Sequence, residues 1–168
     1  VLVKDAVESL YTNTFFIGFA LLVTGGLLFA ADRMGHGNKT EKNATITEVM
    51  LVGLSQAAAT VPGLSRSGTT IAVGMLCGFE RSFAVKFSFL LSIPAVLGAN
   101  LLTLIDAVQA GIDASMLPVY LAGVAAAFIS GFLAISLLRI LVQRGRFGSF
   151  AYYCWGAGLV TLILSLVA

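Results

Sequence analysis

Charged residues are scarce in this sequence. Its 168 residues include ten Lys or Arg and eight Asp or Glu, so that 11% are charged, whereas 58% are hydrophobic. A soluble domain carries about 25% charged residues, so this composition excludes an ordinary water-exposed globular surface. The apolar residues form continuous blocks instead of alternating with a period of two, which excludes an outer-membrane barrel. The composition therefore predicts an all-α, polytopic membrane protein.

Cysteine and net charge are also low. The two cysteines, Cys77 and Cys154, both lie within apolar runs, and we interpret them as small buried residues and not as a disulfide. The formal net charge is only +2, which is too small to indicate nucleic-acid binding. The expected partner is the lipid bilayer, and no nucleic-acid partner is expected.

The apolar blocks fall into two length classes. Two short blocks, residues 49–61 and 68–79, meet at Pro62 and Gly63. Short apolar segments interrupted by Gly and Pro are typical of a re-entrant hairpin, because irregular backbone at membrane depth requires surrounding protein or a water-filled cavity. We predict a single integral membrane domain over residues 1–168, with a re-entrant helix–loop–helix hairpin over about residues 47–79. Four blocks are long enough to span a bilayer, namely residues 14–31, 83–105, 116–138 and 150–168.

The distribution of basic residues predicts the orientation. If the hairpin enters and leaves on one side, that side carries Arg33, Lys39, Lys42, Arg81, Arg139, Arg144 and Arg146. The opposite side carries Lys4, Asp5, Glu8, Asp106 and Asp113. Under the positive-inside rule the basic side is cytoplasmic, so the hairpin tip points outward. Two true spans over residues 47–79 would leave this bias unchanged, so charge alone does not decide between the two topologies. Lys86 can extend to the basic side and needs no function of its own.

The hairpin tip contains PGLSRSGTT, residues 62–70. An arginine at bilayer depth costs at least ~2.5–3.5 kcal/mol, so Arg66 needs an anion, a carboxylate or a wet cavity. Ser67 is expected to cap the following helix, whose first N–H groups then point to the tip. Three interpretations stay open: phosphate binding, a structural ion pair and anion transport. The residues expected to bind phosphate are Ser65, Arg66, Ser67, Gly68, Thr69 and Thr70.

This motif resembles the P-G-x-S-R-S-x-x-T signature of the undecaprenyl pyrophosphate phosphatases, the bacitracin-resistance family. The stretches GML at residues 74–76 and FSFLLSIP at residues 87–94 also match that family. The resemblance implies hydrolysis of undecaprenyl pyrophosphate to undecaprenyl phosphate and inorganic phosphate, which recycles the lipid carrier for peptidoglycan and cell-wall synthesis. It also implies an inverted-repeat fold, a bacterial inner-membrane location and an active site that faces the periplasm. Arg66, Ser65 and Thr70 are the residues to which the resemblance assigns catalytic roles.

The resemblance also implies parts that this sequence lacks. The family's first repeat carries an E-x-x-x-E pattern and a P-x-S-S-x-x-H stretch, which supply carboxylates for Mg²⁺ or Ca²⁺ and a histidine. Neither pattern occurs here, so no metal ligand is assigned in this chain. The only histidine, His36, lies in the loop expected on the cytoplasmic side. We therefore expect a C-terminal portion of such a protein, the second half of the inverted repeat, which is inactive by itself.

Two features allow two interpretations each. Gln56 can line the site or form an interhelical hydrogen bond. Gly63 is expected to line the site, because glycine lets the backbone approach a ligand closely. The G-x-x-x-G at residues 74–78 can serve a homodimer or let the returning hairpin arm pack on a neighbouring helix. The alternative function is an inverted-repeat transporter of an anionic or lipid-phosphate substrate, because such carriers also point helix N-termini at the substrate.

Overall fold

The computed structural model describes residues 13–111, 114–143 and 148–167, and these residues form helices without a named strand. The described helices are α2 (Thr14–Met34), α3 (Ile46–Ala58), α4 (Arg66–Leu76), α5 (Arg81–Ala110), the 3₁₀-helix η1 (Ala114–Met116), α6 (Leu117–Gln143) and α7 (Ser149–Val167). In this part of the chain α2, α5, α6 and α7 are long and apolar enough to cross a membrane. The predicted all-α polytopic fold with four spans is confirmed. The two short apolar blocks form the two short helices α3 and α4.

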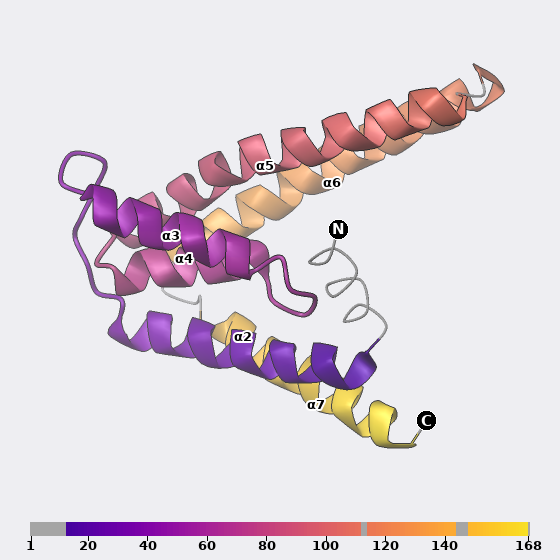
Figure 1. Ribbon diagram of the computed structural model, residues 1–168. Coiled ribbons are helices and arrows are strands. Elements are labelled where there is room, and N and C mark those ends of the chain that lie inside the picture. Colours follow the sequence, from indigo (N-terminus) through magenta and orange to yellow (C-terminus); the bar gives the residue numbers. More distant parts are fainter. Residues whose placement is uncertain (1–12, 112–113, 144–147, 168) are drawn as a thin grey trace.

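The helices are arranged in pairs (Figure 1). The first pair is α2 with α7, and the second is α3 with α4, which lie side by side. The third pair, α5 and α6, extends away from the other two. Helix α4 is central, because it contacts α2, α3 and α5. The hairpin of α3 and α4 is therefore held by two neighbouring helices of the same chain, α2 and α5.

Glycine allows α2 and α7 to pack closely. A Cβ atom added to Gly25 would lie 2.4 Å from Cδ1 of Trp155, and one added to Gly18 would lie 2.8 Å from Cγ of Leu162. The indole Nε1 of Trp155 donates a hydrogen bond of 3.2 Å to the carbonyl of Leu22. Close backbone approach and an interhelical hydrogen bond are the usual means by which membrane helices associate.

The core lies around α4. Ile71, Ala72 and Met75 are fully or almost fully buried. A Cβ added to Gly74 would lie 3.2 Å from the ring of Phe79 and 3.4 Å from the side chain of Ala84. Gly74 of the G-x-x-x-G therefore packs α4 closely on the start of α5, as one of the two interpretations predicts, whereas Gly78 lies in the following turn at φ +90° beside Lys39. A homodimer stays a prediction.

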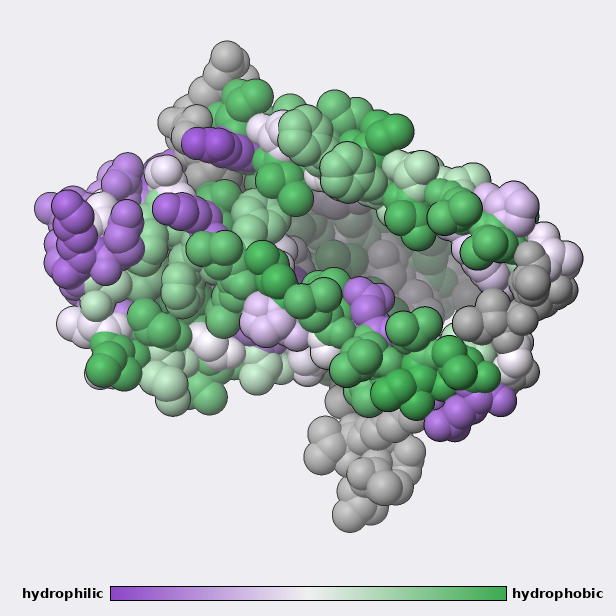
Figure 2. All heavy atoms as spheres, turned by 90° about the horizontal axis from the view of Figure 1, so that it is seen from above, coloured by the Kyte–Doolittle hydropathy of each residue, from purple (hydrophilic) through white to green (hydrophobic). Residues whose placement is uncertain are grey.

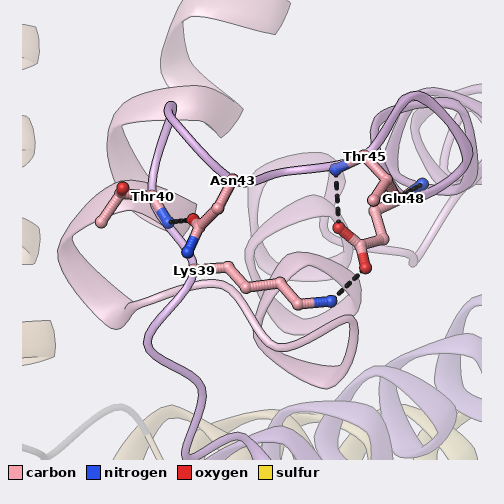
Figure 3. A network of polar contacts seen from close by, with 5 residues as sticks. All are labelled: Lys39, Thr40, Asn43, Thr45 and Glu48. Atoms are coloured by element: carbon pink, nitrogen blue, oxygen red, sulfur yellow. Dashed lines mark hydrogen bonds and ion pairs between the residues drawn. The ribbon is translucent and has the colours of Figure 1, made fainter.

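The loop between α2 and α3 closes the base of the hairpin. Thr45 caps α3 in a capping box with Glu48, and the Glu48 carboxylate also pairs with Lys39 (Figure 3). The Lys39 backbone donates to the carbonyl of Gly78 at 3.0 Å and accepts from the N–H of Glu80 at 2.8 Å. This loop therefore joins the start of α3 to the turn between α4 and α5. We call these contacts the base clamp.

The surface divides into a hydrophilic end and an apolar remainder (Figure 2). Hydrophilic residues gather at the end where the α2–α3 loop lies, and apolar residues dominate over the long helices. Large apolar side chains stay exposed along α5 and α6, as expected for lipid contact. Some charges used in the orientation argument, Lys4, Asp5, Glu8, Asp113, Arg144 and Arg146, lie outside the described residues. The orientation in the membrane stays a prediction.

Candidate functional site

The break between α3 and α4 spans residues 59–65. Ser65 has extended backbone angles (φ −73°, ψ 110°), and its hydroxyl accepts the N–H of Gly68 at 3.1 Å. Ser65 is therefore the N-cap of α4. The expectation that Ser67 caps the helix was wrong, because the helix begins one residue earlier than Ser67, at Arg66. Ser67 instead lies in the first turn.

The break is anchored on α2. Gly63 has φ +89°, a conformation that L side chains rarely adopt, and a Cβ there would lie 2.7 Å from the Cβ of Ala20. The buried hydroxyl of Thr24 donates to the carbonyl of Gly63 at 3.3 Å, and also to the carbonyl of Ala20 at 3.0 Å. Gly63 thus positions the loop through its contact with α2, a role that sequence reasoning did not assign to it.

Arg66 is exposed at the first position of α4. Within the described part of the chain its guanidinium has no carboxylate partner. The main-chain N–H groups of Arg66 and Ser67 likewise have no acceptor among the described residues. The start of a helix carries partial positive charge, so guanidinium, free N–H groups and helix dipole combine at one place. This arrangement can bind an anion, and the ion-pair interpretation finds no support in the described residues.

The two threonines of the motif are buried, at 7% exposed for Thr69 and 1% for Thr70. The Thr70 hydroxyl donates to the carbonyls of Arg66 at 3.0 Å and Ser67 at 3.2 Å, and it forms a hydrogen bond with the hydroxyl of Ser88 in α5. The Thr69 hydroxyl has no partner among the described residues. Thr70 therefore connects α4 to α5 in this structure, and its predicted contact with phosphate stays a prediction.

Gln56 lies on α3 and faces α5. Its amide Nε2 donates to the carbonyl of Leu91 at 3.3 Å, while its buried Oε1 has no partner among the described residues. The interhelical hydrogen bond is thus present, as one of the two interpretations predicts. Whether Gln56 also lines the site stays a prediction.

Two positions that support the motif were not found from the sequence. The Thr24 hydroxyl bonds to the carbonyl of Gly63 in the loop, and the Ser88 hydroxyl forms a hydrogen bond with that of Thr70. Each is an isolated hydroxyl inside an apolar span, which is a weak signal because Ser and Thr in membrane helices commonly bond to their own backbone. Only the neighbouring helix reveals the long-range partner.

A protein site for a metal ion requires several ligating side chains at one place. The described residues contain no group of three or more His, Cys, Asp or Glu that could hold a metal ion. His36 is exposed in the α2–α3 loop, at the other end of the hairpin from the motif (Figure 1). The described residues therefore do not form a metal site by themselves, and the Mg²⁺ or Ca²⁺ implied by the resemblance stays a prediction.

Comparison with known proteins gives consistent results. Two proteins named undecaprenyl-diphosphatase, from Methanosphaera stadtmanae and Methanobrevibacter smithii, are 42% and 44% identical to this chain over 167 residues. Each alignment covers 99% of this chain, which spans 59% and 60% of the lengths of these relatives. A third undecaprenyl-diphosphatase, from Methanothermobacter thermautotrophicus, is 42% identical over 173 residues, covering 99% of this chain and 93% of the relative.

The match to a family model extends over most of the helices described above. It covers residues 1–160 and belongs to the family described as bacitracin resistance protein BacA. Together with the capped, arginine-bearing break between α3 and α4, this match identifies the chain as a member of the bacitracin resistance protein BacA family.

Proposed function

We propose that this chain binds the pyrophosphate of a polyprenyl lipid at the start of α4 and contributes to its hydrolysis. Undecaprenyl pyrophosphate is the proposed substrate, in accordance with the names of the relatives. The observation that carries the proposal is the exposed Arg66 beside the free first-turn N–H groups, without a carboxylate partner in the described residues. Guanidinium forks match phosphate oxygens two at a time.

The depth of the motif supports a re-entrant hairpin. Helices α2 and α4 run side by side in the same direction. Gly68 lies beside Leu28, where an added Cβ would be 3.3 Å away, and Met75 lies beside Gly35, where an added Cβ would be 2.7 Å from the Cβ of Met75. The start of α4 therefore lies beside residue 26 of α2. Residues 14–25 of α2 therefore extend beyond the start of α4, by about 18 Å at the helical rise of 1.5 Å per residue. If α2 spans the bilayer, Arg66 lies near the middle of that span.

The proposed chemistry follows from this placement. Water adds to the terminal phosphorus, the bond from that phosphorus to the bridging oxygen breaks, and undecaprenyl phosphate and inorganic phosphate are released. Catalysis of phosphoryl transfer consists mostly of positioning and charge stabilisation. Arg66 and the N–H groups of the first turn would hold the phosphate oxygens, and Ser65 keeps that turn in place. The proposal places the active site at the periplasmic face of the inner membrane, and the charge bias of the sequence supports this orientation.

Activity of this chain by itself is a separate question. The expectation of an inactive portion rests on the missing carboxylates and histidine. The Methanothermobacter relative, 93% of which this chain covers, is nevertheless named as an undecaprenyl-diphosphatase. Phosphate release should therefore be measured with this chain and with a full-length family member that carries the same motif.

The experiment compares Arg66→Ala and Arg66→Lys with the unchanged protein. Phosphate release from undecaprenyl pyrophosphate should fall by about 10²–10³-fold in Arg66→Ala, the loss typical of one missing charge-stabilising donor. Arg66→Lys should recover only part of it, because an ammonium group cannot bind two oxygens in a fixed plane.

The matched control is Arg33→Ala, which removes an exposed arginine near the base clamp that lies over the ring of Phe29. This variant should retain phosphate release. Unchanged release in Arg66→Ala would overturn the proposal. Movement of the intact lipid across vesicles without phosphate release would instead favour the transporter.

A further inference from the structure

A groove between α5 and α6 is lined by residues that do not belong to the motif. It has a volume of about 520 Å³ and is lined by Ser82, Val85, Lys86, Phe89, Leu90, Ile135 and Arg139. It lies beside the first turns of α5, whereas the motif lies at the start of α4. Only its far end, at Phe89 and Leu90, comes near the motif, because these residues follow Ser88, whose hydroxyl bonds to that of Thr70.

The spacing of the lining residues explains the groove. Ser82, Lys86 and Leu90 of α5 are four residues apart and therefore share one helix face. Ile135 and Arg139 of α6 have the same spacing. Each face thus presents one cation together with apolar side chains. The two faces meet near the end of α6 and the start of α5, so both cations lie at one end of this helix pair.

The two cations lack counter-charges. No carboxylate lines the groove, and neither Lys86 nor Arg139 forms an ion pair within residues 13–111, 114–143 and 148–167. Two acids lie near the start of α5. Asp32 is bound by Arg81, which donates to its carboxylate at 2.8 Å and to its carbonyl at 3.1 Å, and Glu80 lines a separate pocket with Arg81 and Ser82. Two like charges beside one groove repel each other, and an anion between them would offset this repulsion by its attraction to both.

We propose that this groove binds one anionic phospholipid of the surrounding bilayer. Its headgroup phosphate lies between Lys86 and Arg139, and an acyl chain lies along Phe89, Leu90 and Ile135. The charges and the apolar walls together fit an amphiphilic anion better than a soluble one. Basic pockets between membrane helices on the cytoplasmic side bind anionic lipid headgroups in this way, and the charge bias of the sequence places this end on that side.

The test measures lipid selectivity in the purified full chain. The protein is equilibrated in micelles with equal amounts of phosphatidylglycerol and phosphatidylcholine of the same acyl chains, and bound lipid is counted by native mass spectrometry. The unchanged protein should retain one phosphatidylglycerol with about ten-fold preference. Lys86→Gln combined with Arg139→Gln should abolish that preference. Soluble glycerol 3-phosphate, which has no acyl chain, should not displace the lipid.

Two comparisons make the result decisive. Arg33→Gln combined with Lys42→Gln removes two exposed charges outside the groove and should keep the preference. Lys86→Arg combined with Arg139→Lys preserves both positive charges and should keep most of the preference for phosphatidylglycerol. If the neutral double variant does not fold, each single neutral variant should lose part of the preference.

Three outcomes would overturn the proposal. The first is selectivity that persists without both cations. The second is an equal loss of the phosphatidylglycerol preference in the Arg33 and Lys42 control variant, which would indicate that the preference comes from general surface charge and not from the groove. The third is a dimer that dissociates when the cations are removed, which would identify a second copy of the chain as the occupant. Phosphate release by Arg66 variants does not enter this test, so it is independent of the proposed function.

Discussion

At the residue scale, the position of the motif depends on side chains outside it. Thr24 is fully buried and bonds to the carbonyl of Gly63, while Ser65 caps the helix that carries Arg66. Arg66 itself is exposed. Its guanidinium is therefore positioned by its neighbours on both sides of the break, and changes at these neighbours should affect phosphate binding without removing a charge.

Thr24→Val tests this support. Valine has nearly the same shape as threonine but lacks the hydroxyl, so the Gly63 carbonyl loses a donor at a cost of about 1 kcal/mol. We expect a lower thermal unfolding midpoint in detergent and about ten-fold slower phosphate release by the active protein. Thr24→Ser keeps the hydroxyl and should resemble the unchanged protein in both measurements. Equal behaviour of Thr24→Val and the unchanged protein would show that the bond does not position the loop.

At the scale of elements, close helix contacts hold the hairpin. Helix α4 contacts α2 and α5, and Thr70 and Ser88 add a hydrogen bond across the second contact. Helix α2 in turn packs on α7 through glycine. The position of the hairpin therefore depends on α2, which contacts α4 directly, and also on α7, which packs on α2.

Two adjacent glycines of α2 provide a matched test of the α2–α7 contact. A Cβ at Gly25 would lie 2.4 Å from Cδ1 and 2.5 Å from Nε1 of Trp155, whereas a Cβ at Gly26 would meet nothing within 4 Å. Gly25→Ala should destabilise the protein by about 1–3 kcal/mol through overpacking, and Gly26→Ala should be neutral or slightly stabilising. Thermal unfolding of both variants checks this. Similar midpoints would mean that α7 does not pack on α2 in this way.

At the scale of the whole molecule, the base clamp joins segments that are distant in sequence. Lys39 and Glu48 lie beside the turn at Gly78, and the same loop lies next to the start of α5. The hydrogen bond from Lys39 and the backbone N–H of Thr45 hold the pKa of the Glu48 carboxyl below its ordinary value of 4.5. The charged carboxylate is thus favoured by folding, and the clamp depends on pH.

The sign of this dependence follows from the lowered pKa. The ionised Glu48 carboxylate contributes its full stabilisation at pH values above the pKa that it has in the unfolded chain. This contribution is lost as the pH falls through the lower pKa that Glu48 has in the folded protein. The unfolding midpoint should therefore fall between pH 7 and pH 3 by more in the unchanged protein than in Glu48→Gln, which cannot titrate. Glu41→Gln, at an exposed position of the same loop, should retain the full acid dependence. An identical acid response in Glu48→Gln would contradict a role for the clamp.

The amino-acid sequence by itself determined the number of spans, the break near Pro62 and the motif around Arg66. These follow from local chemistry, since long apolar runs must leave water and Pro and Gly interrupt helices. The tertiary structure decided that Ser65, and not Ser67, caps α4, because either serine hydroxyl could accept the N–H three residues later, that of Gly68 or of Thr70, and the local sequence does not choose between them. It also decided that Thr70 bonds to Ser88 and that Lys86 and Arg139 line one groove, because these residues come from different helices and helical periodicity does not predict which faces meet.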